Sequence, residues 1–337
     1  MADPVQPTRI LVVGAGLVGA RHVTQVMEHP GCILAGVVDP EPSRHPRDVP
    51  CFTDVTSVNV PVDGVIIATP TATHGEIGAE AAARRWPMLV EKPIAADVAA
   101  GEALIAACAR AGVPLLVGHH RRHHPFIGAA REMLAAGRLG RVVGVSGLWC
   151  VRKPDPYFRT TWRMGAGGSP VLINLVHDLD LLRCLMGEIV GITASFARGE
   201  GRAIEDTGVV TLTFANGALG SFLFSDAAPS PWSFEAATAE NPTIAGGGRD
   251  VYRIIGTEGA LSLPSLTVFE GTDWSHPVVA RSTVLEPVDP LRRQLDHFIE
   301  VIAGRTQPIC SGADGLAALS TALEIRAAGR AGWEDAA

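Results

Sequence analysis

The sequence lacks the features that mark a membrane or secreted protein. No apolar run reaches the ~18 to 20 residues that a bilayer span requires. Residues 1–7 are polar and contain prolines, without the basic start and apolar segment of a secretory signal. The six cysteines are scattered and form no C-x-x-C pair, which is typical of free thiols in a reducing compartment. These absences predict a cytoplasmic protein without a membrane partner.

Long runs of lysine and arginine are also missing. The formal net charge is −7, and no stretch of the chain creates a strongly positive field. A protein of this charge does not attract a polyanion, so nucleic acid is excluded as a partner. A small neutral or acidic metabolite remains possible, because single arginines and histidines can bind it. With 337 residues, the chain is long enough for two domains with sizeable cores.

Three glycines stand where an apolar, β-branched run (residues 10–13) gives way to a segment of helical character. Gly14, Gly16 and Gly19 have the G-x-G-x-x-G spacing of dinucleotide-binding folds. The first lets the chain turn tightly, the second leaves room for a pyrophosphate, and the third lets helix and strand pack closely. Leu17 and Val18 open the helix, whose unpaired N–H groups would bind the phosphates. The alternative is a plain strand-to-helix turn.

A carboxylate follows the second apolar run. Residues 32–38 end in Asp39, at the distance from the first glycine where such folds place an acid for the adenosine ribose. The carboxylate would accept hydrogen bonds from the ribose and repel a 2′-phosphate, which favours NAD over NADP. Arg44 complicates this expectation, because a guanidinium folded back onto the site would neutralise a 2′-phosphate. Alternatively, Asp39 only caps the strand–loop junction before Pro40.

Strand and helix signals alternate through the first third of the chain and then change character. We expect an α/β Rossmann domain with a parallel, doubly wound sheet over residues 1–120. Residues 121–337 should form an α+β domain on a mainly antiparallel, open-faced sheet. Helices are predicted at 74–85, 97–111, 125–136, 174–186, 291–303 and 314–329, and second-domain strands at 141–151, 191–198, 207–214, 217–225, 252–256 and 260–263.

Five residues of the first domain follow predicted strands. In a parallel sheet the carboxyl ends of the strands share one edge, where ligands bind, so these residues can converge on one crevice. They are Gly14, Asp39, Thr69, Lys92 and His119.

An ordered set of motifs resembles the Gfo/Idh/MocA oxidoreductases over nearly the whole chain. The set comprises the Gly14–Gly19 fingerprint, Asp39, Ala68-Thr69-Pro70 with His74, Glu91-Lys92-Pro93, Gly118-His119-His120-Arg121-Arg122, Gly167-Gly168 and His177-Asp178-Leu179-Asp180. The resemblance implies a Rossmann domain, an open-faced sheet domain, NAD(P), and reversible oxidation of a sugar, polyol or related hydroxy compound. The implied cofactor-binding residues are Gly14, Gly16, Leu17, Val18, Gly19, Asp39, Thr69, Pro70, His74, Glu91, Lys92 and His119.

The same resemblance implies the catalytic roles. It makes Lys92 the residue that contacts the substrate and the nicotinamide ribose, and His177 the residue that exchanges the proton, with the Pro93 peptide bond often cis. Elementary chemistry agrees, because a histidine is suited to proton exchange at neutral pH and a lysine stabilises negative charge on the reacting oxygen. Considered without the other motifs, Lys92 would be interpreted as a surface lysine at the start of a loop and His177 as a core histidine.

One position departs from the family pattern. Many members carry an aspartate four residues before the catalytic histidine, and here that position is Ile173. In a continuous helix, Asn174, His177 and Asp180 would lie along one side at i, i+3 and i+6, so either polar neighbour of His177 is a candidate to orient the ring.

The cluster of residues 119–124 contains four histidines, but in adjacent pairs and without a carboxylate or thiol, so we expect no metal site. We expect instead that His119 lies by the nicotinamide and that Arg122 shapes the substrate pocket or the joint between the domains. Tyr157, Trp162 and Arg163, with Arg159, precede the glycine-rich stretch and are candidates to line the pocket. The alternative for this group is a partly exposed surface loop.

The leading hypothesis is an NAD-dependent dehydrogenase, with NADP possible, acting on a small sugar-like substrate. Two alternatives stay open: NAD-dependent glycoside cleavage, in which the cofactor is recycled, and a non-catalytic NAD-sensing regulator. An exposed sheet face in the second domain would favour self-association, so a homo-oligomer, dimer or tetramer, is expected.

Overall fold

The computed structural model describes residues 6–199, 202–286 and 288–334. The chain divides into two compact units. The first contains the chain up to His123 together with Asp289–Ser320, and the second contains His124–Val288 together with the chain from Thr321 onward. The sequence predicts that all residues after 120 belong to the second domain, whereas the segment Asp289–Ser320 belongs to the first unit.

Unit 1 is built on six short strands that are hydrogen-bonded in the order β3-β2-β1-β4-β5-β6. All neighbouring strands run parallel. Most of their residues are buried, as expected for a sheet covered on both faces. This order confirms the doubly wound Rossmann fold. The strands are β1 (Thr8–Val13), β2 (Cys32–Val38), β3 (Cys51–Phe52), β4 (Gly64–Ile67), β5 (Met88–Val90) and β6 (Leu115–Val117).

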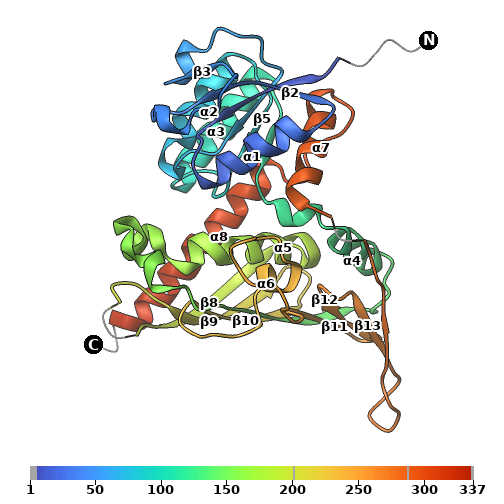
Figure 1. Cartoon of the computed structure of the whole chain (residues 1–337). Coiled ribbons are helices and arrows are strands. Elements are labelled where there is room, and N and C mark those ends of the chain that lie inside the picture. Colours follow the sequence, from blue (N-terminus) through green and yellow to red (C-terminus); the bar gives the residue numbers. More distant parts are fainter. Residues whose placement is uncertain (1–5, 200–201, 287, 335–337) are drawn as a thin grey trace, which may run out of the picture. The chain divides into compact units, whose positions relative to one another are not determined.

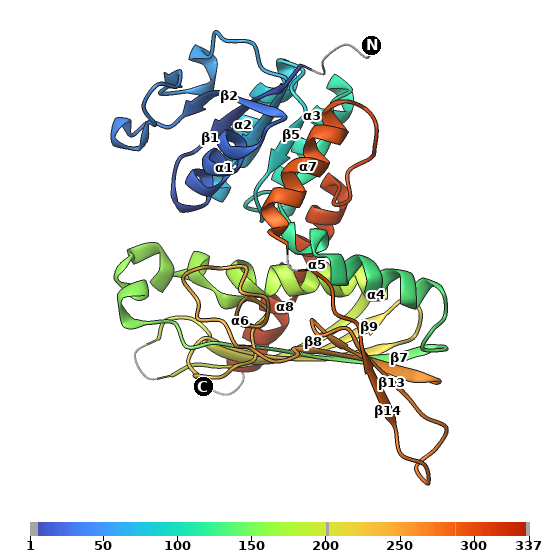
Figure 2. The ribbon, with the colours of Figure 1, turned by 45° about the vertical axis from the view of Figure 1, so that its right-hand side comes forward.

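Four helices cover the two faces of this sheet (Figures 1 and 2). On one face lie α1 (Leu17–Glu28) and α7 (Pro290–Ile302), whose apolar side chains pack on the central strands. On the other lie α2 (His74–Ala83) and α3 (Val98–Ala111), and Asp97 caps α3 by accepting a hydrogen bond from the Ala100 N–H at 2.8 Å. The packing of Leu295 and Phe298 of α7 beside Ile10 and Val12 explains why the late segment returns to unit 1.

Unit 2 contains one eight-stranded sheet in the order β14-β13-β12-β11-β7-β10-β9-β8. Neighbouring strands are antiparallel except β7 and β10, which confirms the mainly antiparallel sheet. The predictions at 207–214 and 252–256 match two strands at both ends. The strands are β7 (Val142–Cys150), β8 (Ile189–Ala197), β9 (Thr207–Phe214), β10 (Leu219–Ser225), β11 (Tyr252–Gly256), β12 (Gly259–Leu263), β13 (Thr267–Glu270) and β14 (Val279–Ser282).

Helices α4 (Pro125–Ala135), α5 (Val176–Met186) and α6 (Phe234–Thr238) lie on one face of this sheet (Figures 1 and 2). Strand β9 shows the consequence, since Val210, Leu212 and Phe214 are buried while the alternate residues Val209 and Thr211 are exposed. The predicted open-faced sheet is therefore present. The last helix, α8 (Gly312–Glu334), starts in unit 1 and ends in unit 2.

The predicted helix at 174–186 has a different start. Residues Val171–Leu175 form a π-helix, and only from Val176 onward is the segment α-helical. Asn174 therefore lies in the wider turn, and the i, i+3, i+6 spacing that we expected for Asn174, His177 and Asp180 does not apply across it. Within the described ranges, no helix is long and apolar enough to cross a membrane.

Candidate functional site

The three glycines of the fingerprint have three different environments. Gly14 has φ +91°, and a Cβ there would lie 2.6 Å from the Ala68 oxygen. A Cβ on Gly19 would lie 1.8 Å from the Gly14 oxygen, so this glycine lets α1 approach the turn. Gly16 is the opposite case, because a Cβ there would meet no atom within 4 Å. The turn is closed around Gly14 and Gly19 and open at Gly16, where a pyrophosphate requires space.

The N-terminus of α1 is suited to an anion. Gly16 occupies the N-cap position without a side-chain capping bond, and the first turn carries no acidic residue. Leu17 and Val18 are 76% and 40% exposed, so the first N–H groups of the helix are not covered by side-chain caps. Free N–H groups and the positive end of the helix dipole bind phosphate oxygens. The residues present therefore fit the pyrophosphate of a dinucleotide.

Asp39 follows β2 and is tied to the same turn. Its Oδ2 accepts a hydrogen bond from the Ala15 N–H at 2.7 Å, and its Oδ1 accepts one from the Glu41 N–H at 2.9 Å. Burial raises the pKa of Asp39, but these two hydrogen bonds and the Arg44 guanidinium outweigh burial and hold it below its usual range. Arg44 Nη1 lies 3.6 Å from Asp39 Oδ2. The arginine thus folds back to Asp39, as the sequence had allowed.

His74 connects two loops at the carboxyl edge of the sheet. Its Nε2 lies 2.9 Å from the Thr69 oxygen and its Nδ1 lies 3.0 Å from the Pro93 oxygen. Thr69 and Pro70 form the loop after β4, and Pro93 follows Lys92 through a cis peptide bond. Burial lowers the pKa of His74, although both carbonyl oxygens oppose this shift. These contacts connect the loop after β4 with the loop after β5. The contact of His74 with a cofactor stays a prediction.

Glu91 and Lys92 follow β5. The Glu91 carboxylate lies in the interior, with its Oε1 2.8 Å from Nε2 of His22 on α1. His22 was not among the predicted site residues. The signal for it was available in the sequence, because a histidine in the apolar stripe of a helix requires a buried polar partner.

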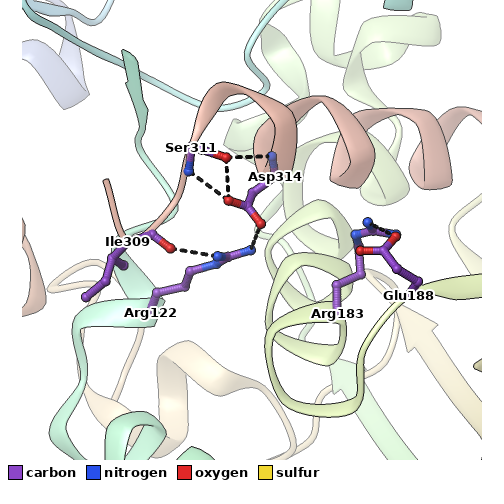
Figure 3. A network of polar contacts seen from close by, with 6 residues as sticks. All are labelled: Arg122, Arg183, Glu188, Ile309, Ser311 and Asp314. Atoms are coloured by element: carbon purple, nitrogen blue, oxygen red, sulfur yellow. Dashed lines mark hydrogen bonds and ion pairs between the residues drawn. The ribbon is translucent and has the colours of Figure 1, made fainter. Parts of the chain in front are cut away.

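His119 and Arg122 follow β6. His119 is almost fully buried. Its position beside the nicotinamide stays a prediction. Arg122 donates a hydrogen bond to the Ile309 oxygen at 2.8 Å, and its Nη2 lies 3.4 Å from Asp314 Oδ1 (Figure 3). Ser311 and Asp314 form a reciprocal cap at the start of α8, with the Asp314 Oδ2 accepting from the Ser311 N–H at 2.8 Å and the Ser311 hydroxyl accepting from the Asp314 N–H at 3.2 Å. Arg122 therefore joins the returning segment to unit 1, and its role toward a substrate stays a prediction.

In unit 2, the helix α5 carries His177 together with two aspartates. His177, Asp178 and Asp180 are all buried, and Asp178 accepts a hydrogen bond from the Tyr252 hydroxyl of β11. The Asn174 Oδ1 is also buried, and no described residue donates a hydrogen bond to it. At the other end of the helix, Arg183 pairs with Glu188 (Figure 3).

Apart from Arg122, the predicted substrate residues lie in the segment that follows β7, in two short helical turns at Asp155–Arg159 and Thr161–Met164. The Arg163 guanidinium stacks 4.1 Å from the centre of the Tyr157 ring and donates to the Tyr157 carbonyl oxygen at 3.2 Å. A Cβ on Gly168 would lie 2.0 Å from the Arg163 oxygen, so the glycine-rich stretch folds tightly against this arginine. The Trp162 side chain lies outside the described part of the structure.

Lys153 adds a second cation beside Tyr157, and the sequence reasoning missed it. Its Nζ lies 5.0 Å from the centre of the Tyr157 ring and 3.2 Å from Asp226 Oδ2. Arg202 Nη2 shares that oxygen at 3.1 Å. Burial lowers the pKa of Lys153, against the attraction of Asp226. Since the chain has only two lysines, Lys92 and Lys153, the rarity of the residue was a usable signal.

The strand order of unit 1 and the open glycine at the start of α1 define a dinucleotide-binding protein. Residues 8–119 match the model of an oxidoreductase family with an NAD-binding Rossmann fold, and residues 127–262 match the GFO/IDH/MocA C-terminal domain. The chain belongs to the Gfo/Idh/MocA family of NAD-binding oxidoreductases.

Several named relatives are similar over most of their length. Inositol 2-dehydrogenase of Rhizobium meliloti is 24% identical over 332 residues, which cover 93% of this chain and 94% of the relative. The 1,5-anhydro-D-fructose reductase of Ensifer adhaerens is 29% identical over 274 residues, covering 78% and 76%. The 2,7-anhydro-N-acetylneuraminate hydratase of Escherichia coli is 28% identical over 233 residues, covering 64% and 61%.

Solved structures share the fold. The WlbA dehydrogenase from Bordetella pertussis, in complex with NADH and UDP-GlcNAcA, has a TM-score of 0.76 at 22% identity and covers 97% of this chain and 98% of that structure. The aldose-aldose oxidoreductase from Caulobacter crescentus, complexed with glycerol, has a TM-score of 0.78 at 24% identity with the same coverage.

Proposed function

We propose that this protein transfers a hydride between NAD and a hydroxyl-bearing carbon of a sugar, a polyol or a related hydroxy compound. The main support is the position of Lys92. It follows β5, and in the parallel sheet of unit 1 this is the same edge that carries the Gly14–Gly19 turn. Relatives named inositol 2-dehydrogenase and 1,5-anhydro-D-fructose reductase support a polyhydroxylated substrate.

The proposed roles of the chain's own residues follow from the charge that the reaction moves. NAD, when bound, accepts the hydride. The substrate oxygen then loses a proton, and His177 is the proposed base because a histidine exchanges protons at neutral pH. The ammonium group of Lys92 stabilises the negative charge that develops on this oxygen. Gly14, Gly16, Gly19 and Asp39 hold the cofactor.

A substrate screen with both cofactors tests the proposal. Purified protein is mixed with sugars, polyols and hydroxy acids, and nicotinamide absorbance is followed. On the best substrate, Lys92→Ala and His177→Ala should each lower kcat by on the order of a hundredfold or more while NAD binding persists. The double variant should lose less than the product, because groups acting on one oxygen behave as a unit. His276→Ala, at an exposed histidine, is the matched control. Near-normal turnover by His177→Ala would remove His177 from the mechanism.

A second candidate function is one in which oxidation of the substrate is transient and the cofactor is recycled. A relative named 2,7-anhydro-N-acetylneuraminate hydratase supports it, because adding or removing water causes no net oxidation. NAD-dependent bond cleavage would then consume substrate without net release of NADH. Comparing substrate loss with NADH formation separates the two functions. Equal amounts support the dehydrogenase, and substrate loss without NADH supports recycling.

We further propose that unit 2 contributes substrate binding and self-association, and that the protein works in the cytoplasm. Its open sheet face exposes Val209, Leu219, Leu223 and Ile255 in an array without a covering helix in the described part of the chain. All six cysteines are free thiols, as in a reducing compartment. Light scattering measures the oligomeric state, and Leu223→Glu on the exposed face should shift an oligomer toward the monomer.

A further inference from the structure

His22 is a polar residue in the apolar stripe of the phosphate-binding helix. The buried residues of α1 are Gly19, His22 and Val26, spaced so that they face the sheet together. Gly19 packs on the fingerprint turn, and His22 lies one helical turn further along. Its side chain is only 3% exposed. A buried imidazole requires a partner, and this one reaches across the sheet edge to the loop after β5.

That partner is the Glu91 carboxylate. Its Oε1 lies 2.8 Å from His22 Nε2. Burial raises the pKa of Glu91, but the hydrogen bond and charge of His22, with the nearby His120 and Lys92, outweigh burial and lower it to about 2. The group is therefore ionised throughout the neutral range. A buried carboxylate with one strong partner holds that partner firmly, because losing it would leave an uncompensated charge.

The second oxygen of the Glu91 carboxylate contacts the backbone of Lys92. Glu91 Oε2 accepts a hydrogen bond from the Lys92 backbone N–H at 3.3 Å. Gly118, after β6, closes the other side, since a Cβ there would lie 3.0 Å from the carboxyl carbon and from both oxygens. One carboxylate thus touches α1, the Lys92 backbone and the end of β6. Its position fixes where the Lys92 side chain begins.

We propose that His22 is a positioning residue, which acts through the Glu91 carboxylate to hold Lys92 in register with the N-terminus of α1. Because that N-terminus binds the pyrophosphate, the link sets the distance between the bound cofactor and the Lys92 ammonium. The inference rests on the proposed role of Lys92 at the reacting oxygen. It adds a residue outside the motifs that define the family resemblance, and a task for the glutamate of the Glu-Lys-Pro motif.

The kinetic test compares His22 of α1 with His29, the residue that follows the last residue of α1. His22→Phe removes the bond to Glu91 and retains a ring of similar size. His29→Phe is the matched control, because His29 Nε2 also lies 2.8 Å from a carboxylate, Asp296 Oδ1 of α7, far from the Lys92 loop in the chain. His22→Phe should lower kcat about tenfold or more with little change in the Kd of NAD, since a misplaced catalytic group costs rate rather than cofactor binding. His22→Gln, which retains a donor, should recover part of the loss, and it replaces His22→Phe if that variant fails to fold.

A second readout needs no turnover. Because the chain has two lysines, protein labelled with ¹³C at lysine Cε gives two side-chain NMR signals, from Lys92 and Lys153. His22→Phe and Glu91→Gln should shift the Lys92 signal and its pH titration while the Lys153 signal stays in place. His29→Phe should move neither. An unchanged Lys92 signal in both variants, or an equal kcat loss in His29→Phe, would overturn the inference. Full activity of Lys92→Ala would instead overturn the proposed function, and the NMR result would still report on the link.

Discussion

The fingerprint turn of unit 1 and the His177 helix of unit 2 are encoded in different ways. In the turn, the functional atoms belong to the backbone, and the glycines work by the room that they leave: closed at Gly14 and Gly19, open at Gly16. In the helix, the proposed functional atoms belong to side chains, and the helix is held by partners from distant strands, such as Tyr252 with Asp178. A spacing rule therefore describes the first region well. The second region depends on contacts that no local pattern contains.

The largest expected effect separates the closed glycines from the open one. Gly19→Ala should destabilise the protein by about 3 kcal/mol, because a Cβ there would lie 1.8 Å from the Gly14 oxygen. Gly16→Ser should leave the melting temperature unchanged or raise it, since serine is a good N-cap residue and the space is open. The same variant should weaken NAD binding about tenfold or more by blocking the pyrophosphate. Thermal unfolding and NAD titration check both. Equal destabilisation by Gly19→Ala and Gly16→Ser would contradict the distinction between a closed and an open glycine.

Buried His123 of unit 1 should make the stability of the protein depend on pH. Burial lowers the pKa of His123 to about 3, helped by the positive charges of His297, His120, Arg122 and Arg293. The unfolded chain binds this proton near pH 6.5 and the folded chain does not, so stability should fall as the pH drops from 6.5 toward 3. By pH 5 the loss is about 2 kcal/mol.

The measurement is denaturant unfolding as a function of pH. His123→Phe should flatten the dependence over this range, and His276→Phe, at an exposed position, should retain it. An unchanged pH profile in His123→Phe would show that another group carries the effect.

Cofactor choice is expected to respond to Asp39. Asp39→Ser removes hydrogen bonds to the ribose and a repulsive charge, so it should weaken NAD binding about tenfold and narrow the gap to NADP. Arg44→Ala tests the opposing influence, because the guanidinium lies 3.6 Å from the carboxylate and would favour a 2′-phosphate. Titration with both cofactors is decisive. A wild-type preference for NADP would transfer the role from Asp39 to Arg44.

The smallest expected effect on kcat concerns the polar residue that orients His177, either Asn174 or Asp180. Asn174 lies in the π-helical turn and Asp180 in the α-helix, so the two differ in backbone setting as well as charge. The variant with the larger loss of kcat, Asn174→Ala or Asp180→Ala, identifies the residue that orients the imidazole, and its pH–rate profile should shift. If neither variant changes kcat, other contacts hold the imidazole ring. In that case neither Asn174 nor Asp180 replaces the aspartate that many family members carry at the position of Ile173.

Some elements of the fold could be predicted from the sequence and others could not. The cap of α3 by Asp97 and the β9–β10 hairpin were predictable because each depends on residues close together in the chain. The parallel, doubly wound sheet of unit 1 was predictable from the alternation of strand and helix signals. Strands β13 and β14 were missed, since all four residues of β14 are exposed and show no alternation. The segment Asp289–Ser320 was predicted in the second domain because the packing of α7 on β1 joins residues that are far apart in the chain, such as Ile10 and Phe298.

The same limit applies to the candidate site. The strand-end positions of Lys92 and Asp39 follow from periodicity and spacing. The partners of the site residues do not, because His22 with Glu91 and Lys153 with Asp226 meet only in the folded chain.

The most direct test of the proposed hydride transfer follows the hydrogen on the reacting carbon of the substrate. A substrate from the screen is prepared with deuterium on the carbon that bears the reacting hydroxyl, and the protein is incubated with it and NAD. The account predicts that deuterium appears in released nicotinamide cofactor, in an amount equal to the oxidised product, and that Lys92→Ala and His177→Ala slow its appearance by on the order of a hundredfold. Binding of NAD without label transfer from any compound of the screen would contradict the account and indicate a sensor of the cofactor.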